Sequence, residues 1–352
     1  MTPALPPVDA LLLLSFGGPE GPDDVRPFLA NVTRGREIPP QRIEAVAGHY
    51  MRFGGRSPIN DECRRLLAAL EVELARRGPA LALYWGNRNW APMLEDTVAR
   101  MARDGVRHAL AIATSAFSSY SSCRQYLGDI ERAREVVGEA APLIEKLPPY
   151  WNHPGFLETM IEHTRIALTA NLAARKATAG QTGDVARLVF TAHSIPLSMS
   201  ESCDYVAELE EACAIVAAAA APDLTWDLVY QSRSGPPAQA WLGPDVCDHL
   251  RTLHSGGVRH VVLVPIGFVV DHMEVVYDLD TEARAVAQSL GITLTRAACA
   301  GSAARFVAGL RDIVAARLEG RAADSLGTRG ARPRPCASGC CGELGTGTDF
   351  PE

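Results

Sequence analysis

The chain of 352 residues has a formal net charge of −7, which argues against a general nucleic-acid binder. Its 47% hydrophobic and 21% charged residues are typical of a soluble globular protein and not of a disordered one. No apolar run reaches the roughly 20 residues that cross a bilayer, and the short apolar run at 10–14 lacks the basic flank and cleavage site of a signal peptide. We therefore expect a cytoplasmic protein without a transmembrane segment, long enough for two domains.

The first part of the chain alternates apolar strands with helices. Short apolar runs predict strands, and apolar residues at helical spacing predict helices. The expected strands are 8–16, 81–85 and 109–114, and the expected helices are 23–32, 59–77, 93–104 and one that ends near 137. This alternation predicts a mostly parallel, doubly wound sheet with right-handed crossovers.

The second part repeats the alternation after a proline-rich boundary at 148–150. The expected strands are 187–191, 226–231, 261–264 and 292–296, and the expected helices are 155–174, 205–220, 244–253 and 303–318. We therefore expect an α/β fold of two similar domains, residues 1–148 and 149–302, with a cleft between them. The helix 303–318 is expected to pack back on the first domain. Residues 319–352, rich in Gly, Pro, Ala and Arg, are expected to form a flexible tail.

Imidazole and carboxylate groups follow two of the expected strands. His193 comes directly after the strand 187–191, and His272 and Glu274 follow the strand 261–264. Parallel strands present their carboxyl ends on one edge of a sheet, where ligands bind in open α/β folds, so these groups should converge. A lone histidine is more often structural. A converging imidazole and carboxylate suit a divalent metal such as Fe²⁺ or Zn²⁺, and the same pair can equally move protons.

Three carboxylates recur at four-residue spacing, in Glu274, Asp278 and Glu282. On a helix this spacing places them along one face. The face is either a solvated helix surface or a path for a divalent cation that ends at His272 and Glu274, and the pattern leaves both open. The chain has neither an HExxH motif nor paired CxxC motifs, so a permanently bound catalytic zinc is not expected.

Aromatic and polar residues occur in the loops at the strand ends. A flat apolar ligand could bind among the aromatic residues, although each of them alone is more often part of a core. They are Phe16, Trp85, Trp90, Phe117, Tyr120, Tyr126 and Phe268. Hydroxyl and guanidinium groups nearby could bind the carboxylates of such a ligand, and we assign this role to Tyr50, Arg52, Ser57, Ser121 and Tyr126.

A series of motifs resembles the ferrochelatase family in order and spacing as well as in letters. The motifs are FGGPE at 16–20, FGGRSPI at 53–59, TAHSIP at 191–196, WLGPD at 241–245 and VPIGFVVDHMEVVYDLD at 264–280. The resemblance runs from about residue 8 to residue 318. It implies two Rossmann-like domains and an enzyme that inserts Fe²⁺ into a porphyrin held in the cleft between them.

The resemblance also implies roles for individual residues. His193 would be the active-site histidine and Glu274 its partner across the porphyrin, and which of the two accepts the pyrrole protons is left open. Asp278 and Glu282 would extend the acidic path along a distorted helix. Phe16 would face the metal from the first domain, where other members carry Tyr or Met, which leaves open the side chain that first binds iron. Cleft walls that bend the planar porphyrin would expose its nitrogen lone pairs.

Coproporphyrin III is the porphyrin that we expect, with coproheme III as the product. It carries four propionates where protoporphyrin IX carries two, and the polar residues named above favour the more acidic porphyrin, as does the lack of a membrane segment. The sequence also looks most like the bacterial branch that makes coproheme. The alternatives are protoporphyrin IX as substrate, insertion of cobalt or nickel, and a tetrapyrrole or metal carrier without turnover. The resemblance leaves room for transient contact with other heme-pathway enzymes.

The C-terminal segment carries Cys336, Cys340 and Cys341. Thiolates at such spacing suit an iron–sulfur cluster or zinc. Some ferrochelatases hold a [2Fe-2S] cluster with three tail cysteines and one cysteine within the fold, and the resemblance implies such a cluster here. The helix 155–174, where those relatives carry the fourth ligand, has no cysteine. An unligated or redox-reactive tail is the alternative. The fourth ligand is open among Cys63, Cys123, Cys203, Cys213, Cys247 and Cys299.

Overall fold

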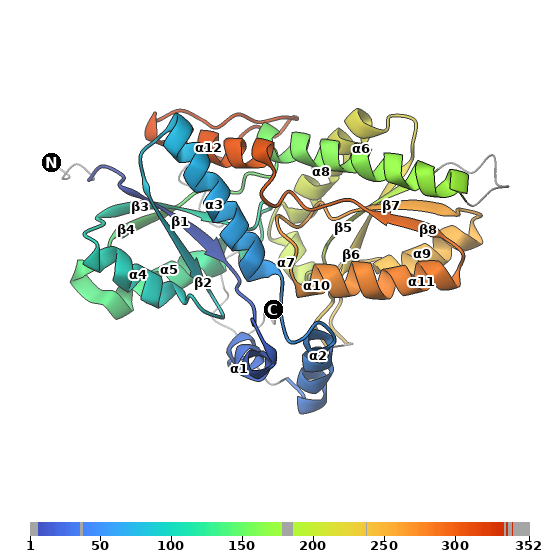
Figure 1. Cartoon of the computed structure of the whole chain (residues 1–352), viewed down its shortest axis with the longest axis horizontal. Helices are drawn as coiled ribbons and strands as arrows, with labels where there is room; N and C mark the ends of the chain where they lie inside the picture. Colours follow the sequence, from blue (N-terminus) through green and yellow to red (C-terminus); the bar gives the residue numbers. More distant parts are fainter. Residues whose placement is uncertain are drawn as a thin grey trace.

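The computed structural model describes residues 6–35, 38–177, 186–236 and 238–333, together with Cys336 and Cys340. Two separate four-stranded parallel sheets, each flanked by helices, form its two halves (Figure 1). This arrangement confirms the predicted α/β fold with two similar, Rossmann-like halves. The domain limits at residues 148 and 302 stay predictions.

Apolar runs form the first sheet, in which all strands are parallel in the order β2-β1-β3-β4. Leu12 in β1 lies opposite Tyr84 on one side and Ala111 on the other. β1 and β3 are buried along their whole length, as expected of central strands with helices on both faces. The strands are β1 (Ala10–Ser15), β2 (Ala82–Asn87), β3 (His108–Ala113) and β4 (Leu143–Lys146).

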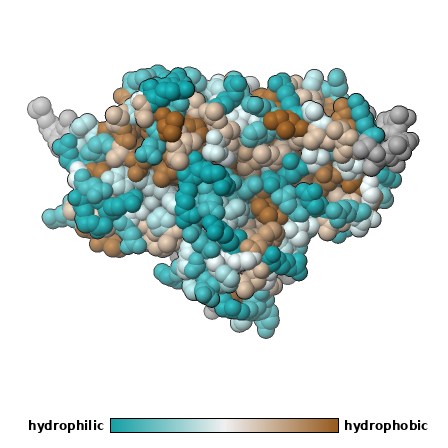
Figure 2. Space-filling view, in the orientation of Figure 1, coloured by the Kyte–Doolittle hydropathy of each residue, from teal (hydrophilic) through white to brown (hydrophobic). Residues whose placement is uncertain are grey.

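The helices of the first half present apolar residues to this sheet and charged residues to solvent. In α3, Leu66 and Leu70 are buried, and hydrophilic side chains cover the outer face of this helix in the middle of the view in Figure 2. Two of the elements in this half, α2 and β4, are not predicted from the sequence pattern. The helices are α1 (Pro22–Val32), α2 (Pro40–Arg52), α3 (Ile59–Arg77), α4 (Leu94–Arg103), a π-helix (Tyr120–Arg124), α5 (Gln125–Val137) and a 3₁₀ turn (Gly138–Ala140).

The second sheet repeats this plan, with parallel strands in the order β6-β5-β7-β8. Phe190 in β5 lies opposite Val264 in β7, and His193 at the end of β5 lies opposite Gln231 in β6. The strands are β5 (Arg187–His193), β6 (Trp226–Gln231), β7 (His260–Val264) and β8 (Thr293–Arg296). The helices are α6 (Pro154–Ala177), α7 (Leu197–Glu201), α8 (Tyr205–Ala220), α9 (Val246–Ser255), α10 (Met273–Val275), a π-helix (Val276–Ala283), α11 (Arg284–Ser289) and α12 (Ala304–Leu318).

Each sheet has a topological switch point between two of its central strands. The first strand of each half lies between the second and the third, so the connections that leave these central strands diverge. The carboxyl ends of strands at such a point are the usual ligand site of an open α/β sheet. In the first sheet this point lies beside Phe16, and in the second it lies beside His193 and the loop that leads to Glu274.

Helix α12 joins the two halves, because it packs on α3 of the first half and on α6 of the second (Figure 1). The Arg311 guanidinium donates to the carbonyl oxygens of Arg77 and Gly78, each at 3.0 Å, at the C-terminal end of α3, where the helix dipole favours a cation. Where α12 crosses α6, a Cβ on Gly155 would lie 2.6 Å from the Cα of Gly309. Besides the expected position of α12 on the first domain, the structure shows the contact of α12 with α6, which the sequence does not predict.

Helices α1 and α2 form a small lobe that projects below the two sheets in Figure 1. Val25, Phe28 and Tyr50 from this lobe share a hydrophobic cluster with Met273 and Tyr277 from the second half. The lobe therefore connects the first half to the segment around Glu274.

Residues 319–333, which we call the C-terminal strap, lie along the molecule without forming a helix or strand. Leu326 N donates to the Asn152 carbonyl oxygen at 2.8 Å, and Asn152 Nδ2 donates to the Gly330 carbonyl oxygen at 2.7 Å. The expectation of a flexible tail did not anticipate these contacts. Cys341 lies outside the described residues. Among the helices in the described ranges, none is both long and apolar enough to span a bilayer.

Candidate active site

His193 and Glu274 lie close together at the carboxyl edge of the second sheet. β5 ends at His193, and Glu274 lies in α10, after the loop that leaves β7. His193 Nε2 is 3.5 Å from Glu274 Oε2, and His272 Nδ1 is 4.0 Å from the same oxygen. The exposed fractions are 33% for the His193 side chain and 50% for Glu274, so a ligand can reach both. The structure thus brings together the two groups that the sheet-edge argument placed at one point.

Backbone contacts fix the two segments that carry this pair. Gly267 N donates to the Thr191 carbonyl oxygen at 3.1 Å, and a Cβ on Gly267 would lie 2.6 Å from the Cβ of Ala192. A residue without a side chain therefore lets the loop after β7 lie against the end of β5. On the other side, the Tyr205 hydroxyl donates to the His193 carbonyl oxygen at 3.0 Å.

The hydrogen bonds of His193 decide which ring nitrogen can accept a proton. Nδ1 donates to the Ser194 carbonyl oxygen at 2.5 Å, so a neutral His193 has its lone pair on Nε2, on the side of Glu274. Burial lowers the pKa of His193, but the hydrogen bond and charge of Glu274 outweigh burial and hold this pKa above its ordinary value. Burial would raise the pKa of Glu274, but His193 and His272 lower it to about 2. Burial holds the pKa of His272 below its usual value. The site is therefore a permanent carboxylate beside an imidazole that readily accepts a proton.

Asp278 and Glu282 continue from Glu274 toward the surface. They lie in the π-helix Val276–Ala283, and π-helical turns occur often at functional sites. Asp278 is half-buried and Glu282 is exposed, so the row leads from His193 to solvent. Burial raises the pKa of Asp278 to about 7, and the charges of Glu274 and Glu282 add to this rise. Asp278 can therefore take up and release a proton near neutral pH.

Two residues that the sequence analysis did not name hold Asp278 in place. Ser232 Oγ donates to Asp278 Oδ2 in a short hydrogen bond that opposes the rise of the Asp278 pKa. Gln231 Nε2 donates to the same oxygen at 3.4 Å and to the Glu274 carbonyl oxygen at 3.3 Å. Ser232 has a φ of 61°, a left-handed conformation that is uncommon outside glycine and is found at functional sites. Gln231 ends β6, next to β5, so the rule that located His193 could also have located this pair.

A partly buried arginine, Arg296, fixes the acidic segment from the outer strand β8. Arg296 Nη1 lies 3.0 Å from Asp271 Oδ1, and Arg296 Nη2 lies 2.8 Å from Asp280 Oδ2. Both carboxylates belong to the segment that carries Glu274, so Arg296 holds the two ends of this segment together. The sequence offered no signal for these pairs, because no motif relates β8 to the preceding helix.

Three of the residues assigned to the porphyrin lie on or beside the α1–α2 lobe. Phe16 is 37% exposed and packs edge-on against Phe28, with ring centroids 6.2 Å apart. Burial raises the pKa of Tyr50, and the charge of Glu274 adds to the rise, while the ring shares a hydrophobic cluster with Met273 and Tyr277. The Arg52 guanidinium lies 5.9 Å from the centre of the Tyr277 ring. The lobe therefore places these residues near the acidic helix.

The other three assigned residues lie outside the α1–α2 lobe, in the main body of the first half. Ser121 Oγ donates to the sulfur of Met199 at 3.9 Å, which brings the π-helix of the first half to the segment after His193. Ser57 and Tyr126 are buried, and Tyr126 belongs to the core under the first sheet. The structure thus brings Ser121 toward the His193 segment and keeps Ser57 and Tyr126 in the interior. Binding of the porphyrin by these residues stays a prediction.

Within the ranges that the structure describes, no three His, Cys, Asp or Glu side chains are grouped so that they could hold a metal ion. An imidazole and a carboxylate are nevertheless suitable ligands for Fe²⁺. A pair that leaves most coordination positions open fits iron as a substrate that is handed on.

Two Rossmann-like halves, with an imidazole–carboxylate pair at a switch point and an acidic row leading away, define a protein of the metal-chelatase class. The family model for ferrochelatase matches residues 8–318, and the chain belongs to the ferrochelatase family.

Individual proteins agree with this assignment. The chain is 48% identical to a protein of Streptomyces coelicolor named coproporphyrin III ferrochelatase, over 95% of this chain and 93% of the relative. It is 47% identical to a protein of Rhodopirellula baltica named ferrochelatase, over 96% of this chain and 94% of the relative. The solved structure of SirB from Bacillus subtilis with Fe³⁺ covers 89% of this chain and 98% of its own, with a TM-score of 0.50 and 12% identity. That likeness concerns the fold alone.

Proposed function

We propose that this chain inserts Fe²⁺ into coproporphyrin III and releases coproheme III. The observation that carries the proposal is the accessible pair of His193 and Glu274, 3.5 Å apart at the switch point of the second sheet. Family membership supports metal insertion, and the name of the Streptomyces relative supports coproporphyrin III as the porphyrin.

The chemistry of insertion gives each member of the pair a role. Two pyrrole N–H bonds break and their protons leave as Fe²⁺ bonds to the porphyrin nitrogens. We assign the acceptance of these protons to His193, because its Nδ1 is bound to the Ser194 carbonyl oxygen, which leaves the lone pair on Nε2, and because its pKa is raised. The Glu274 carboxylate then stabilises the imidazolium. We assign to Asp278 and Glu282 the outward passage of protons, because Asp278 titrates at about pH 7 and Glu282 reaches solvent.

The propionates and the macrocycle need separate partners. We propose that Phe16 contacts the face of the porphyrin, since this aromatic residue is 37% exposed at the switch point of the first sheet. Cations and hydroxyls bind carboxylates well. We therefore propose as propionate partners Arg52, which is exposed, and Ser121, which is half-buried. For Tyr50, Ser57 and Tyr126, which are buried, the same proposed role rests on the sequence alone.

We also propose that the tail cysteines hold a [2Fe-2S] cluster, with Cys336 and Cys340 as two of its ligands. Burial raises the pKa of the Cys336 thiol, and the thiols of Cys340 and Cys123 add to the rise. Thiolates are the usual ligands of such a cluster, which would supply redox-active iron. Cys341 lies outside the described residues. Iron and sulfide content and the visible absorption of anaerobically purified protein test the cluster, and a colourless, sulfide-free preparation would rule it out.

We propose the cytoplasm as the location of the enzyme. All eight cysteines that the structure describes are free thiols, which suits a reducing compartment. Fractionation of cells that express the protein tests the location, and recovery with the membranes would contradict it.

An anaerobic assay with Fe²⁺ and either coproporphyrin III or protoporphyrin IX tests the choice of porphyrin. We expect conversion of coproporphyrin III with the higher kcat/KM. Faster conversion of protoporphyrin IX would identify that porphyrin as the substrate. Tight binding of coproporphyrin III without insertion would identify a carrier, and preference for Co²⁺ or Ni²⁺ over Fe²⁺ would identify a different chelatase.

A further inference from the structure

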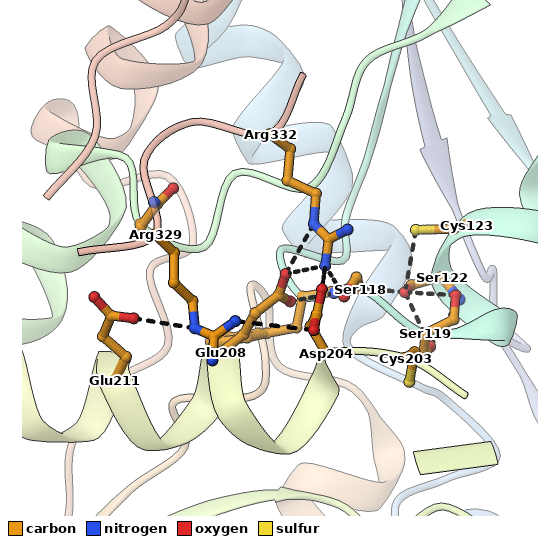
Figure 3. Close-up of polar contacts among 12 residues, drawn as sticks. Ser118, Ser119, Ser122, Cys123, Cys203, Asp204, Glu208, Glu211, Arg329 and Arg332 are labelled. Carbon is orange, nitrogen blue, oxygen red and sulfur yellow. Dashed lines mark hydrogen bonds and ion pairs between the residues drawn. The ribbon is translucent and has the colours of Figure 1, made fainter. Parts of the chain in front are cut away.

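The C-terminal strap meets the first turn of α8 in ion pairs that centre on the buried carboxylate of Glu208 (Figure 3). Arg332 Nη2 lies 2.7 Å from Glu208 Oε1 and 2.6 Å from Asp204 Oδ2, and Arg332 Nε donates to the same Glu208 oxygen at 3.0 Å. The exposed fraction is 2% for the Glu208 side chain and 16% for Arg332. An unpaired charge at such depth is strongly unfavourable, so Glu208 needs a cationic partner. Arg332 supplies this partner from the strap.

Glu208 also binds the loop that follows β3. Ser118 N donates to Glu208 Oε2 at 2.7 Å, and Arg332 Nη2 donates to Ser118 Oγ at 2.9 Å (Figure 3). Burial raises the pKa of Glu208, whereas the Ser118 N–H and the Arg332 guanidinium favour the ionised form. One buried carboxylate therefore joins a loop of the first half, a helix of the second half and the strap.

The loop beyond Ser118 has its own internal order. Ser122 Oγ donates to the Phe117 carbonyl oxygen at 2.6 Å, which closes the loop on itself. Ser121 points to the second half, where its hydroxyl contacts the sulfur of Met199. Because the loop is closed, its anchor at Ser118 decides where Ser121 lies.

The same turn of α8 holds the backbone of His193. Tyr205, the first residue of α8, donates its hydroxyl to the His193 carbonyl oxygen at 3.0 Å. The ring of Tyr205 packs edge-on against Phe117, with centroids 6.5 Å apart. Glu208 follows Tyr205 by three residues and so lies on the same face of the helix. One helical turn thus links His193 to the loop that carries Ser121.

We propose that Arg332 is a positioning residue for iron insertion, which through Glu208 fixes the Ser118 loop against α8 and so sets Ser121 relative to His193. The inference rests on the proposed function, because Ser121 is there assigned to a propionate of the porphyrin. Arg329 offers a contrast within the strap. Its side chain is 43% exposed, and its ion pairs are with Glu211 at 3.2 Å and Asp204 at 3.8 Å, both outside the loop.

Steady-state kinetics of Arg332→Ala, with Arg329→Ala as the matched control, test the role. Both variants remove one arginine from the strap. We expect Arg332→Ala to raise KM for coproporphyrin III about tenfold with a smaller change in kcat, and Arg329→Ala to match the unmodified protein. Arg332→Lys should recover part of the loss, because an ammonium keeps the charge but not the guanidinium fork. The double variant Glu208→Gln/Arg332→Ala should recover more, because no buried charge is left unpaired and the glutamine oxygen can still accept from Ser118 N.

Hydrogen exchange of the segment 117–126 provides a readout that does not depend on turnover. We expect faster exchange in Arg332→Ala than in Arg329→Ala. Equal KM values in these two variants, or faster exchange with an unchanged KM, would overturn the positioning role. If Arg332→Ala does not fold, Arg332→Lys and the double variant decide by the same criteria. If the unmodified protein itself inserts no iron, the proposed function fails. Hydrogen exchange of 117–126, together with coproporphyrin III binding measured by fluorescence quenching, then still decides whether Arg332 positions the loop.

Discussion

Replacement of Glu274 by Gln removes a charge from the candidate active site with little change in shape. Glu274 Oε2 lies 3.5 Å from His193 Nε2. At that distance two unit charges attract each other by about 1 kcal/mol in water and about 5 kcal/mol at an effective dielectric constant of 20. Half of the Glu274 side chain is exposed, so solvent screening places the contribution near the lower value, at about 1–2 kcal/mol.

The pH dependence of this contribution follows from the two pKa shifts. The pKa of His193 is raised, so its share of stability is fully present below the ordinary value of 6.5 and is lost as the pH rises through the folded-state pKa. The pKa of Glu274 is lowered to about 2, so its share is present above the ordinary value of 4.5 and is lost as the pH falls toward 2. The pair therefore stabilises the fold most between pH 4.5 and 6.5.

Urea unfolding of the unmodified protein and Glu274→Gln at about pH 5.5 and about pH 8.5 measures this window. The free energies of unfolding should differ by about 1–2 kcal/mol at the lower pH, and the difference should shrink at the higher pH. An NMR titration of the variant should show the pKa of His193 lowered, since burial remains and the carboxylate is gone. A stability difference that is equal at both pH values, or an unchanged pKa of His193, would refute the reasoning.

Two further predictions concern the acidic row and the junction of the halves. Asp278→Asn should lower kcat about a hundredfold and remove the fall in rate below pH 7, because an amide cannot titrate. A pH–rate profile that the substitution leaves unchanged would exclude Asp278 from proton transfer. Gly155→Ala should destabilise the fold by about 1–3 kcal/mol, because its Cβ would meet the backbone of Gly309 at 2.6 Å. Gly128→Ala in helix α5 is the matched control, since its Cβ would lie at an ordinary 3.4 Å from Arg132 Nη1. This variant should stabilise the fold by about 0.5–1 kcal/mol, because alanine favours a helix more than glycine does. Equal effects of the two substitutions on the free energy of unfolding would contradict the close crossing of α6 and α12.

The local pattern of apolar residues was sufficient to predict the strands that are buried on both faces of the sheets. The apolar runs of β1, β3, β5 and β7 are readable because a central parallel strand has no polar face. The convergence of His193 and Glu274 then follows from the rule that parallel strands end at one edge. The same rule applied to β6 would have added Gln231 and Ser232.

The elements that were missed depend on contacts distant in sequence. α2 has Pro40 at its first position and Ile43, Ala47 and Tyr50 at helical spacing, but its apolar face is narrow and packs across onto the second half, at Tyr277. β4 is an edge strand of only four residues, half of them charged.

The strap was missed for a different reason. Its order comes from Arg332 and Glu208, which lie more than a hundred residues apart in the sequence. Hydrophobic periodicity does not detect ion pairs, and composition does not indicate which arginine pairs with a buried carboxylate.

The central claim is that His193 and Glu274 together carry out iron insertion. The most direct measurement is the anaerobic rate of Fe²⁺ insertion into coproporphyrin III by His193→Ala and Glu274→Gln, with His163→Ala as control. His163 lies on α6, where its ring contacts the Ala298 carbonyl oxygen. We expect a loss of about a hundredfold or more in each of the first two variants and an unchanged rate in the control. Near-normal rates in both His193→Ala and Glu274→Gln would contradict it.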